Sequence, residues 1–526
     1  MEIKGIYDIA KAINSFESSE TVYLNSGNIS LAVIGEKPDK TAKEIADNFK
    51  TSGSDIAGKI NELFLTAIFD KESGVLHILS DLFSSPYNLY YTVADSKFYY
   101  SSSLKWLLKV SGIKRELDQD AVSYFKINGF VLGDKTLIKG VNKLGYAEEI
   151  IVSKNGVSKK ALKYTFNYQQ KPAARAKLIN TVRESIRNSS GISEPCIALS
   201  SGYDSNMVLD TLRKVPDTFV HAFSVGGETG RNETVAVSEN VKNMSGVDLS
   251  VSIVNRDNFN TLADIVWRLE GSVFERGIIL QYALAKSISE YGIENPVCIC
   301  GECADQVMNR NFRDDMNKTL SGKNRPDQRL LYNYNPFVTG TTIILKKSSL
   351  MLNSFGITSR YPFIKKNVLE NTVPLGKENG LGKNLYRKLC ANELPDFVLK
   401  NISMVGGSTN NNAILNEEDY AKLKAGLKRS PVVAKITTQT VPRYISFVEQ
   451  THRVKGVLKR YFSSLKPKKG EDKKPFTLKT NDMTEELMSV YLLLFYELFI
   501  TGNHDDAFDK VSSPLNTKEI LNIYDI

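Results

Sequence analysis

Two carboxylates in this sequence stand where an apolar run ends and a helix is expected to begin. Asp204 lies in SSGYDS, residues 200–205, directly after the apolar run CIAL. Asp305 lies in GECAD, residues 301–305, directly after the apolar run VCIC. In a parallel sheet, ligands bind at the carboxyl ends of the strands, where the turn into a helix exposes backbone N–H groups. Both aspartates are therefore expected where an anion or a metal ion could bind.

The loop that holds Asp204 has the composition of a phosphate site. Ser200, Ser201 and Gly202 are small enough to let the main chain approach an anion, and successive N–H groups there can form a nest for phosphate. A carboxylate beside a phosphate is repelled unless a cation lies between them, so Asp204 and Asp305 are predicted ligands of Mg²⁺ on a bound nucleotide. For this loop alone, a turn that only caps the following helix is the alternative. The second aspartate favours the nucleotide site.

The elements that must position these residues alternate along the chain. Short, wholly apolar strands followed by amphipathic helices predict a doubly wound parallel sheet with helices on both faces. After the last strand the chain is expected to be mainly helical, broken by a charged loop at 466–476. The expected strands are 195–200, 219–226, 249–254 and 296–301, and the expected helices are 174–190, 233–244, 259–270 and 277–291.

The first part of the chain has a different pattern. Short segments rich in aromatic and β-branched residues, separated by turn residues, predict a β-rich sandwich with few helices. NYQQKPAARA at 167–176 is a polar break that contains proline. The predicted domains are therefore 1–168 and 174–526, an α+β part followed by an α/β part.

Composition excludes several other classes of protein. The most apolar run, LMSVYLLLFYELFI at 487–500, carries Glu497 and is too short to span a bilayer, and no secretory signal is present at the start. Five cysteines, an odd number, do not indicate a disulfide framework, so a cytoplasmic protein with reduced thiols is expected. Cys298 and Cys300 should share one face of a buried strand. Four scattered histidines offer no metal-ligand spacing.

The net charge of +9 comes from 68 Lys and Arg against 59 Asp and Glu, and part of the excess lies at 455–476. That segment could contact nucleic acid. A solvated helix and loop is favoured, because no aromatic residues alternate with the charges, so neither nucleic acid nor a membrane is an expected partner.

Several segments of this chain, within residues 25–415, resemble segments of the asparagine synthetase family and occur in the same order as in that family. SSGYDS is similar to the family's SGGxDS pyrophosphate loop, with Ser201 in place of a glycine, and GECAD to its GEGAD segment. The other similar segments are FVHAFSVGG at 219–227, NETVAVSE at 232–239, SRYPFIKK at 359–366, KNLYRKLCANELP at 383–395 and, in the amidotransferase-like domain, LTAIFDKESGVLHILSDLFSSPYNLYYT at 65–92 and FYYSSSLKWLLK at 98–109.

The resemblance implies an Ntn-amidotransferase-like first domain and a second domain of the adenine nucleotide hydrolase type. ATP and Mg²⁺ would bind there, a substrate carboxylate would be adenylated, and an amine would then form an amide and release AMP. Glu302 would take the amine's proton or only position substrate. For the ATP site, the resemblance implies that the backbone around Leu199 and Val225 holds adenine. The loop residues Ser200, Ser201, Gly202 and Ser205 would bind the pyrophosphate, and Asp204 its metal ion. Gly301, beside Glu302, would lie where the carboxyl group and the amine meet.

The sequence departs from the family at the glutaminase nucleophile. The family's full enzymes have a cysteine directly after the initiator methionine, whereas this chain has Glu2 and no cysteine before Cys196. Glutamine hydrolysis through a thioester is therefore not expected. The pattern resembles the β-lactam and carbapenam synthetases and the lasso-peptide cyclases. Lys365 also replaces the aspartate of the family's PFLD segment.

The family's distal lysine has no ungapped counterpart. Eight residues beyond the LP proline lies Ser403, but a Gly-Ser pair at Gly407 and Ser408 places the expected lysine near Lys400. Lys400 is thus the candidate cation of the amide-forming step, with a surface lysine at a helix end as the alternative. Lys383 is expected to lie outside the site.

The predicted function is an ATP-dependent, AMP-forming amide ligase without its own glutaminase. Its partners would be a small-molecule or peptide carboxylate, an amine and, in one variant, a protein that supplies substrate. The alternatives are an ammonia-dependent asparagine synthetase and a non-catalytic nucleotide-binding scaffold.

Overall fold

The computed structural model describes most of the chain, and every structural statement below concerns these residues. No helix among them is long and apolar enough to cross a membrane. Lys400, the Gly407–Ser408 pair and the charged segment at 455–476 lie outside the described residues. The described ranges are 2–17, 22–83, 87–131, 133–228, 232–242, 244–275, 277–321, 335–380, 382–396, 414–437 and 483–526.

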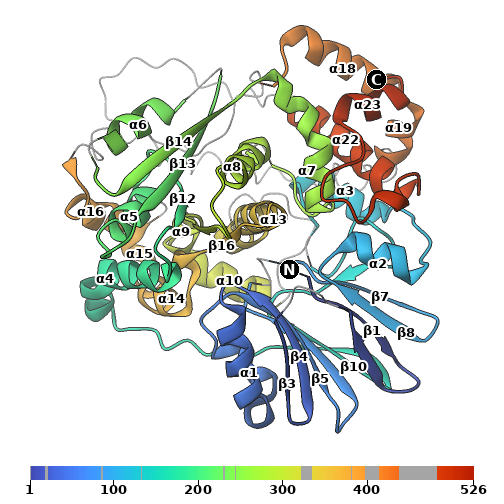
Figure 1. Ribbon diagram of the computed structural model, residues 1–526, viewed down its shortest axis with the longest axis horizontal. Helices are drawn as coiled ribbons and strands as arrows, with labels where there is room; N and C mark the ends of the chain where they lie inside the picture. Colours follow the sequence, from blue (N-terminus) through green and yellow to red (C-terminus); the bar gives the residue numbers. More distant parts are fainter. Residues whose placement is uncertain are drawn as a thin grey trace, which may run out of the picture.

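The first part of the chain is a sandwich of two sheets with antiparallel neighbours, as its aromatic and β-branched segments predicted (Figure 1). One sheet has the order β2-β1-β8-β7-β9 and the other the order β11-β10-β6-β5-β4-β3. The strands are β1 (Lys4–Asp8), β2 (Ile13–Phe16), β3 (Val22–Ser26), β4 (Ile29–Gly35), β5 (Phe64–Asp70), β6 (Val75–Ser80), β7 (Tyr90–Ala94), β8 (Lys97–Ser101), β9 (Asn142–Lys143), β10 (Glu148–Ser153) and β11 (Gly156–Ala161).

A core between the two sheets joins side chains of both, including Tyr7 and Tyr100 from one and Ile34 and Ile78 from the other. The outer face of the second sheet is covered by helix α1, so all seven residues of β4 are buried. The helices of this part are α1 (Pro38–Ser52), the 3-10 helix η1 (Gly53–Gly58), α2 (Leu104–Ser111) and α3 (Gln119–Asn128).

The second part contains the predicted parallel sheet, with the strand order β14-β13-β12-β15-β16. One apolar cluster packs α4, α5, α6 and α16 on one face, and another packs α7, α8 and α13 on the other, which makes the sheet doubly wound. The strands are β12 (Cys196–Ala198), β13 (Val220–Gly227), β14 (Val247–Val254), β15 (Val297–Ile299) and β16 (Thr358–Arg360).

The helices around this sheet largely match the predicted ones. The expected helix at 259–270 is shorter, because residues 256–261 form a 3-10 turn that Asn255 caps through a capping box. In chain order, the helices of this second part are α4 (Lys171–Ser190), α5 (Tyr203–Leu212), α6 (Thr234–Lys242), the 3-10 helix η2 (Arg256–Thr261), α7 (Leu262–Leu269), α8 (Ile278–Glu290), α9 (Ala304–Val307), α10 (Phe312–Leu320), α12 (Pro336–Val338), the π-helix η3 (Thr339–Leu345) and α13 (Lys346–Ser354).

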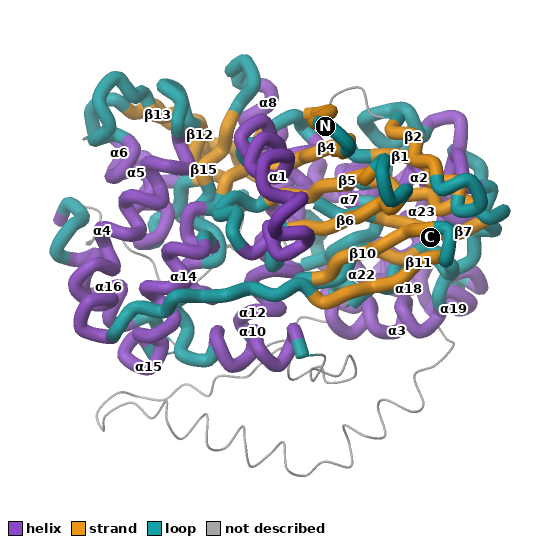
Figure 2. Tube along the Cα trace, turned by 90° about the horizontal axis from the view of Figure 1, so that it is seen from below, coloured by secondary structure: helices purple, strands orange, loops and turns teal. Residues whose placement is uncertain are grey.

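The last part of the chain is mainly helical where it is described, as expected. Its apolar run forms a buried helix, α22, that packs on α7 and on α3 of the first part (Figures 1 and 2). The helices are η4 (Pro362–Ile364), α14 (Lys366–Thr372), η5 (Val373–Leu375), α15 (Gly376–Asn379), α16 (Asn384–Ala391), α18 (Glu417–Arg429), α19 (Pro431–Thr437), α22 (Met483–Phe495), the π-helix η7 (Tyr496–Ile500), η8 (Asp505–Ala507) and α23 (Thr517–Ile523).

Candidate active site

The two predicted strand ends lie side by side. Strands β12 and β15 are hydrogen-bonded neighbours, with Cys196 opposite Cys298. The loop after β15 touches the start of α5 so closely that a Cβ built on Gly301 would lie 3.1 Å from the backbone nitrogen of Ser205. The fold therefore brings SSGYDS and GECAD together at the carboxyl edge of the sheet, as the sequence predicted.

The N–H groups of the first three residues of the SSGYDS loop are hydrogen-bonded within the protein. The Ser200 amide donates to Ser205 Oγ at 3.1 Å, and the Gly202 amide donates to Ser200 Oγ at 3.2 Å. Ser201 donates through its amide at 3.1 Å and its hydroxyl at 2.7 Å to the carboxylate of Glu233, which directly precedes α6. A phosphate on these amides would replace two serine hydroxyls, which can rotate away, and one carboxylate, which is itself an anion.

Asp204 and Asp305 converge on one cation, and that cation is a lysine. The ammonium group of Lys383 forms an ion pair with Asp204 and lies 2.9 Å from Asp305 Oδ1. The expectation that Lys383 lies outside the site is therefore wrong. Lys383 has a φ of 46°, in the left-handed region, at the turn that starts α16, and this conformation places its buried side chain between the two acids.

The charges of this trio are strongly coupled. Burial raises the pKa of Asp204, against the opposing charge of Lys383. Burial would lower the pKa of Lys383, but the charges of Asp204 and Asp305 outweigh it, so the pKa of the lysine is raised. Asp204 Oδ1 is buried with no hydrogen-bond partner in the described part of the chain. A second cation would therefore find one free, buried oxygen here.

The donor set suits Mg²⁺ only if phosphate or water completes it. Mg²⁺ is usually held by one or two carboxylates together with substrate phosphates and water. Asp204 and Asp305 supply two carboxylates, and no group of three or more metal-ligating side chains occurs among the residues that the structure describes. The pair therefore fits an ion that arrives with phosphate, and does not form a complete metal cage of its own.

Glu302 lies one residue beyond Gly301 and faces α13. Its Oε1 accepts a hydrogen bond of 3.3 Å from the Ser348 hydroxyl. Burial raises the pKa of Glu302, and the charge of Lys347 opposes this rise only in part. A carboxyl group with a raised pKa beside a substrate site is a candidate for taking up or delivering a proton.

Of the residues expected at the adenine, Leu199 directly follows β12 and Val225 lies in β13. The Leu199 amide donates to the Phe223 carbonyl at 2.8 Å, so this N–H group is already hydrogen-bonded to the neighbouring strand. Val225 pairs with Ser252 of β14 and is partly exposed. Cys298 and Cys300 are buried with their Sγ atoms 3.7 Å apart, which confirms core cysteines on one strand.

Sequence reasoning missed Lys383 and Glu233 as members of the site. Lys383 is the first residue of KNLYRK, which was matched to a family segment that begins with lysine, and that match could have placed it in the site. Glu233 lies in NETVAVSE, which was also matched, but nothing in its residue type indicated a contact with the serine loop.

Comparison with known proteins supports this arrangement of domains. A family model described as glutamine amidotransferase domain matches residues 41–165, and one described as asparagine synthase matches residues 175–321. No curated protein matches the chain.

Two solved structures have weak similarity. A glutamine phosphoribosylpyrophosphate amidotransferase from B. subtilis, complexed with ADP and GMP, shares 8% identity over 58% of this chain and 63% of its own, with a TM-score of 0.19. A structure of the allosteric regulatory enzyme of purine biosynthesis shares 9% identity over 58% of this chain and 61% of its own, also with a TM-score of 0.19. The matches span less than two thirds of the length of either matched protein.

The order of the two matched domains agrees with the fold and with the two acids at the sheet edge. The chain has the domain architecture of the asparagine synthetase family, a glutamine amidotransferase domain followed by an asparagine synthase domain.

Proposed function

We propose that this protein is an ATP-dependent, AMP-forming amide ligase that uses an amine other than one released from glutamine by its own first domain. The observation that carries the proposal is the convergence of Asp204 and Asp305, from neighbouring parallel strands, on a single cation beside the SSGYDS loop. Two acids and a lysine at a loop rich in backbone N–H groups suit a nucleotide whose phosphates arrive with a metal ion.

The proposed reaction has two steps. A carboxylate oxygen of the substrate attacks the α-phosphorus of ATP, and the bond to pyrophosphate breaks. The amine nitrogen then attacks the acyl carbon, AMP leaves, and the nitrogen loses a proton. Mg²⁺ bound at Asp204 and Asp305 would neutralise charge on the phosphates.

The side chains and amides of the site would each have a role in these two steps. Lys383, whose ammonium group lies between the two acids, would neutralise charge on the phosphates. The amides of Ser200, Gly202 and Ser205 and the hydroxyls of the two serines would donate to the departing pyrophosphate, where preorganised donors stabilise developing charge. Glu302 would accept the amine's proton or position substrate, and Glu302→Gln distinguishes the two: loss of the acidic limb in the pH profile of product formation, the fall in rate at low pH, indicates proton transfer.

The absence of a thiol supports the second half of the proposal. No cysteine occurs in residues 1–195, so the amidotransferase-like domain has no side chain able to form a glutamyl thioester. The amine would come from the substrate itself, from a second molecule or from ammonia, and a partner protein could supply it.

The test is a product analysis of the full chain. Purified protein is incubated with ATP, Mg²⁺ and a panel of amino acids, β-amino acids and peptides, with and without ammonia. AMP and pyrophosphate are expected with at least one carboxylate, and no glutamate is expected from glutamine. Formation of ADP and inorganic phosphate, or glutamate above a buffer control, would contradict the proposal.

A further inference from the structure

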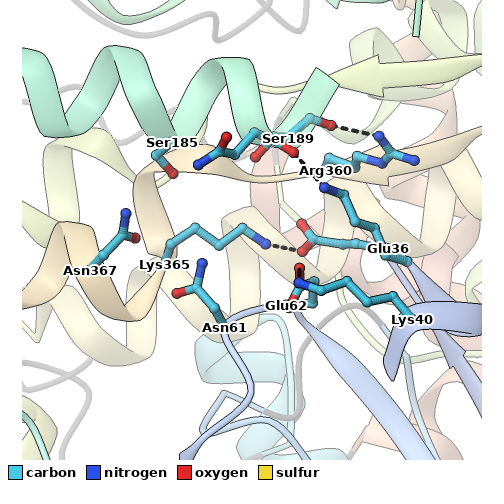
Figure 3. A pocket seen from close by; sticks show the side chains of 11 residues that line it. Glu36, Lys40, Asn61, Glu62, Ser185, Ser189, Arg360, Lys365 and Asn367 are labelled. Carbon is cyan, nitrogen blue, oxygen red and sulfur yellow. Dashed lines mark hydrogen bonds and ion pairs between the residues drawn. The ribbon is translucent and has the colours of Figure 1, made fainter. Parts of the chain in front are cut away.

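A polar cavity of about 250 Å³ lies between the two parts of the molecule, where the end of β4 and the start of α1 face α4, β16 and α14 (Figure 3). No residue that lines it belongs to the candidate active site. Its charged lining residues are Glu36, Lys37, Lys40 and Glu62 from the first part and Arg360 and Lys365 from the second.

Two of these cations are neutralised by the two acids. Lys365 forms a buried ion pair with Glu36, and Figure 3 shows the two side chains directed at each other. Lys40 lies 2.8 Å from Glu62. The same Glu36 carboxylate also accepts the Tyr361 amide at 2.9 Å, so it holds the two parts of the chain together. Both acids that line the cavity therefore already form an ion pair with a lysine.

Lys37 and Arg360 have no carboxylate of their own. Lys37 Nζ donates to the Asn188 carbonyl at 2.6 Å, and Arg360 donates through Nη1 to the carbonyls of Ser189, at 2.6 Å, and Ser190. No acid in the described ranges lies within 4 Å of either group, and Arg360 Nε is buried without a partner. Lys37 and Arg360 are thus left without an ion pair. Glu62, which is paired with Lys40, also attracts both of them, and Glu44 lies 3.5 Å from Lys40, so the excess of positive charge at the cavity is offset only in part.

Capping of α4 is a structural reason for these contacts, but it does not balance the charge. The three accepting carbonyls belong to the last turn of α4, where a cation is favoured by the helix dipole. That dipole supplies only about half an elementary negative charge, against two full positive charges. Burial, and then the charge of Arg360, lowers the pKa of Lys37, which agrees with a shortage of negative charge here.

We propose that this cavity binds a small oxyanion, a phosphate or carboxylate group, between Lys37 of the first part and Arg360 of the second. Its volume is below the roughly 300–1,000 Å³ of sites for drug-sized ligands, which limits the occupant to a small anion or the charged end of a larger one. Because one cation comes from each part, the bound anion stabilises the contact between them. The inference does not rest on the proposed ligase function.

The test measures the melting temperature of the full chain against inorganic phosphate and against succinate, each at constant ionic strength with chloride as reference. A ligand at about 100 times its Kd should raise the melting temperature by about 2 °C or more. Lys37→Gln and Arg360→Gln should abolish the rise, and the anion that produces it identifies the group as phosphate or carboxylate. Lys43→Gln, an exposed lysine of α1 that does not line the cavity, is the matched control and should keep it.

The controls separate this cavity from the SSGYDS loop, which could also bind phosphate. A rise of equal size in wild type and in Lys37→Gln would place the anion elsewhere and overturn the proposal, as would no rise with either anion. Both variants also remove a contact with the last turn of α4 and can lower stability by themselves, so the rise in melting temperature on adding the anion, and not the melting temperature itself, decides the result.

Discussion

Lys383 is the residue whose position changes the interpretation of the site most. Its ammonium group lies between Asp204 and Asp305, where a metal ion bound to both carboxylates would be expected. The sequence located both acids because each follows a short apolar strand. It did not locate Lys383, which lies 78 residues after Asp305 at the turn before α16. No apolar strand leads into this turn, so no pattern indicated that the lysine lies close to the two acids.

Lys383→Met should make the protein more responsive to Mg²⁺. Without the ammonium group the two carboxylates face each other with no cation, and removal of one partner of a buried ion pair costs up to about 3–5 kcal/mol. Melting temperatures should therefore be lower than wild type without metal, and Mg²⁺ should raise them more than it raises the wild type.

The control is Lys388→Met, an exposed lysine on the same helix, which should behave as wild type. An equal response of Lys383→Met and wild type to Mg²⁺ would mean that the two acids do not form a cation site.

Among the elements, the contact between the end of β15 and the start of α5 sets the site's geometry. The alternating strand and helix pattern predicted one parallel sheet, and the two aspartates at strand ends suggested that their strands are neighbours. The order β14-β13-β12-β15-β16 confirms this. The strand β16 was not predicted, because it has only three residues, TSR, and all three are polar. Helix α1 was not predicted either, because it lies between the strand-forming segments of β4 and β5.

Gly301→Ala tests the contact between these two elements. The added Cβ would lie 3.1 Å from Ser205 N and 3.3 Å from the Asp204 carbonyl carbon, both main-chain atoms that cannot turn aside. Overpacking of this kind costs about 1–3 kcal/mol, and displacement of the loop should lower nucleotide turnover by roughly tenfold or more. Turnover is measured as AMP formed per minute with the carboxylate that the panel identifies.

Gly145→Ala is the matched control, because its Cβ would meet only the flexible side chain of Glu148. Full turnover in Gly301→Ala would show that α5 and the β15 loop need no close contact for the reaction.

In the molecule as a whole, the two parts are joined by buried contacts far apart in sequence. Tyr491 of the last part stacks on Phe125 of the first, with ring centroids 5.5 Å apart. Lys346, at the start of α13, is buried near Lys143 and Asp81 of the first part. None of these contacts could be predicted from periodicity, because a pattern assigns a residue to a buried face without identifying its partner.

Lys346 gives this contact region a dependence on pH. Burial, and then the charge of Lys143, lowers the pKa of Lys346 to about 7, with Asp81 opposing. Between about pH 7 and 10 the unfolded chain binds a proton here that the folded chain does not, so wild-type stability gains from this group as pH rises. The gain is at most about 1.4 kcal/mol per pH unit.

Lys346→Met removes this pH-dependent contribution to the free energy of unfolding. The melting temperature of the variant relative to wild type should be highest at pH 7 and fall towards pH 9.5, measured by thermal unfolding in matched buffers. Lys286→Met, on the exposed side of α8, should show no such trend. A difference between Lys346→Met and wild type that stays constant with pH would mean that Lys346 keeps its proton in the folded protein.

The central claim, that Asp204 and Asp305 hold the metal of a bound ATP during adenylation, is tested most directly by substrate-dependent exchange of labelled pyrophosphate into ATP. With the carboxylate identified in the panel, wild type and Asp314→Asn, an exposed acid of α10, should exchange equally. Asp204→Asn and Asp305→Asn should each lose exchange by roughly a hundredfold or more, because loss of one charge-stabilising group costs a few kcal/mol in the transition state, while each still unfolds cooperatively. Full exchange in either variant would contradict the claim.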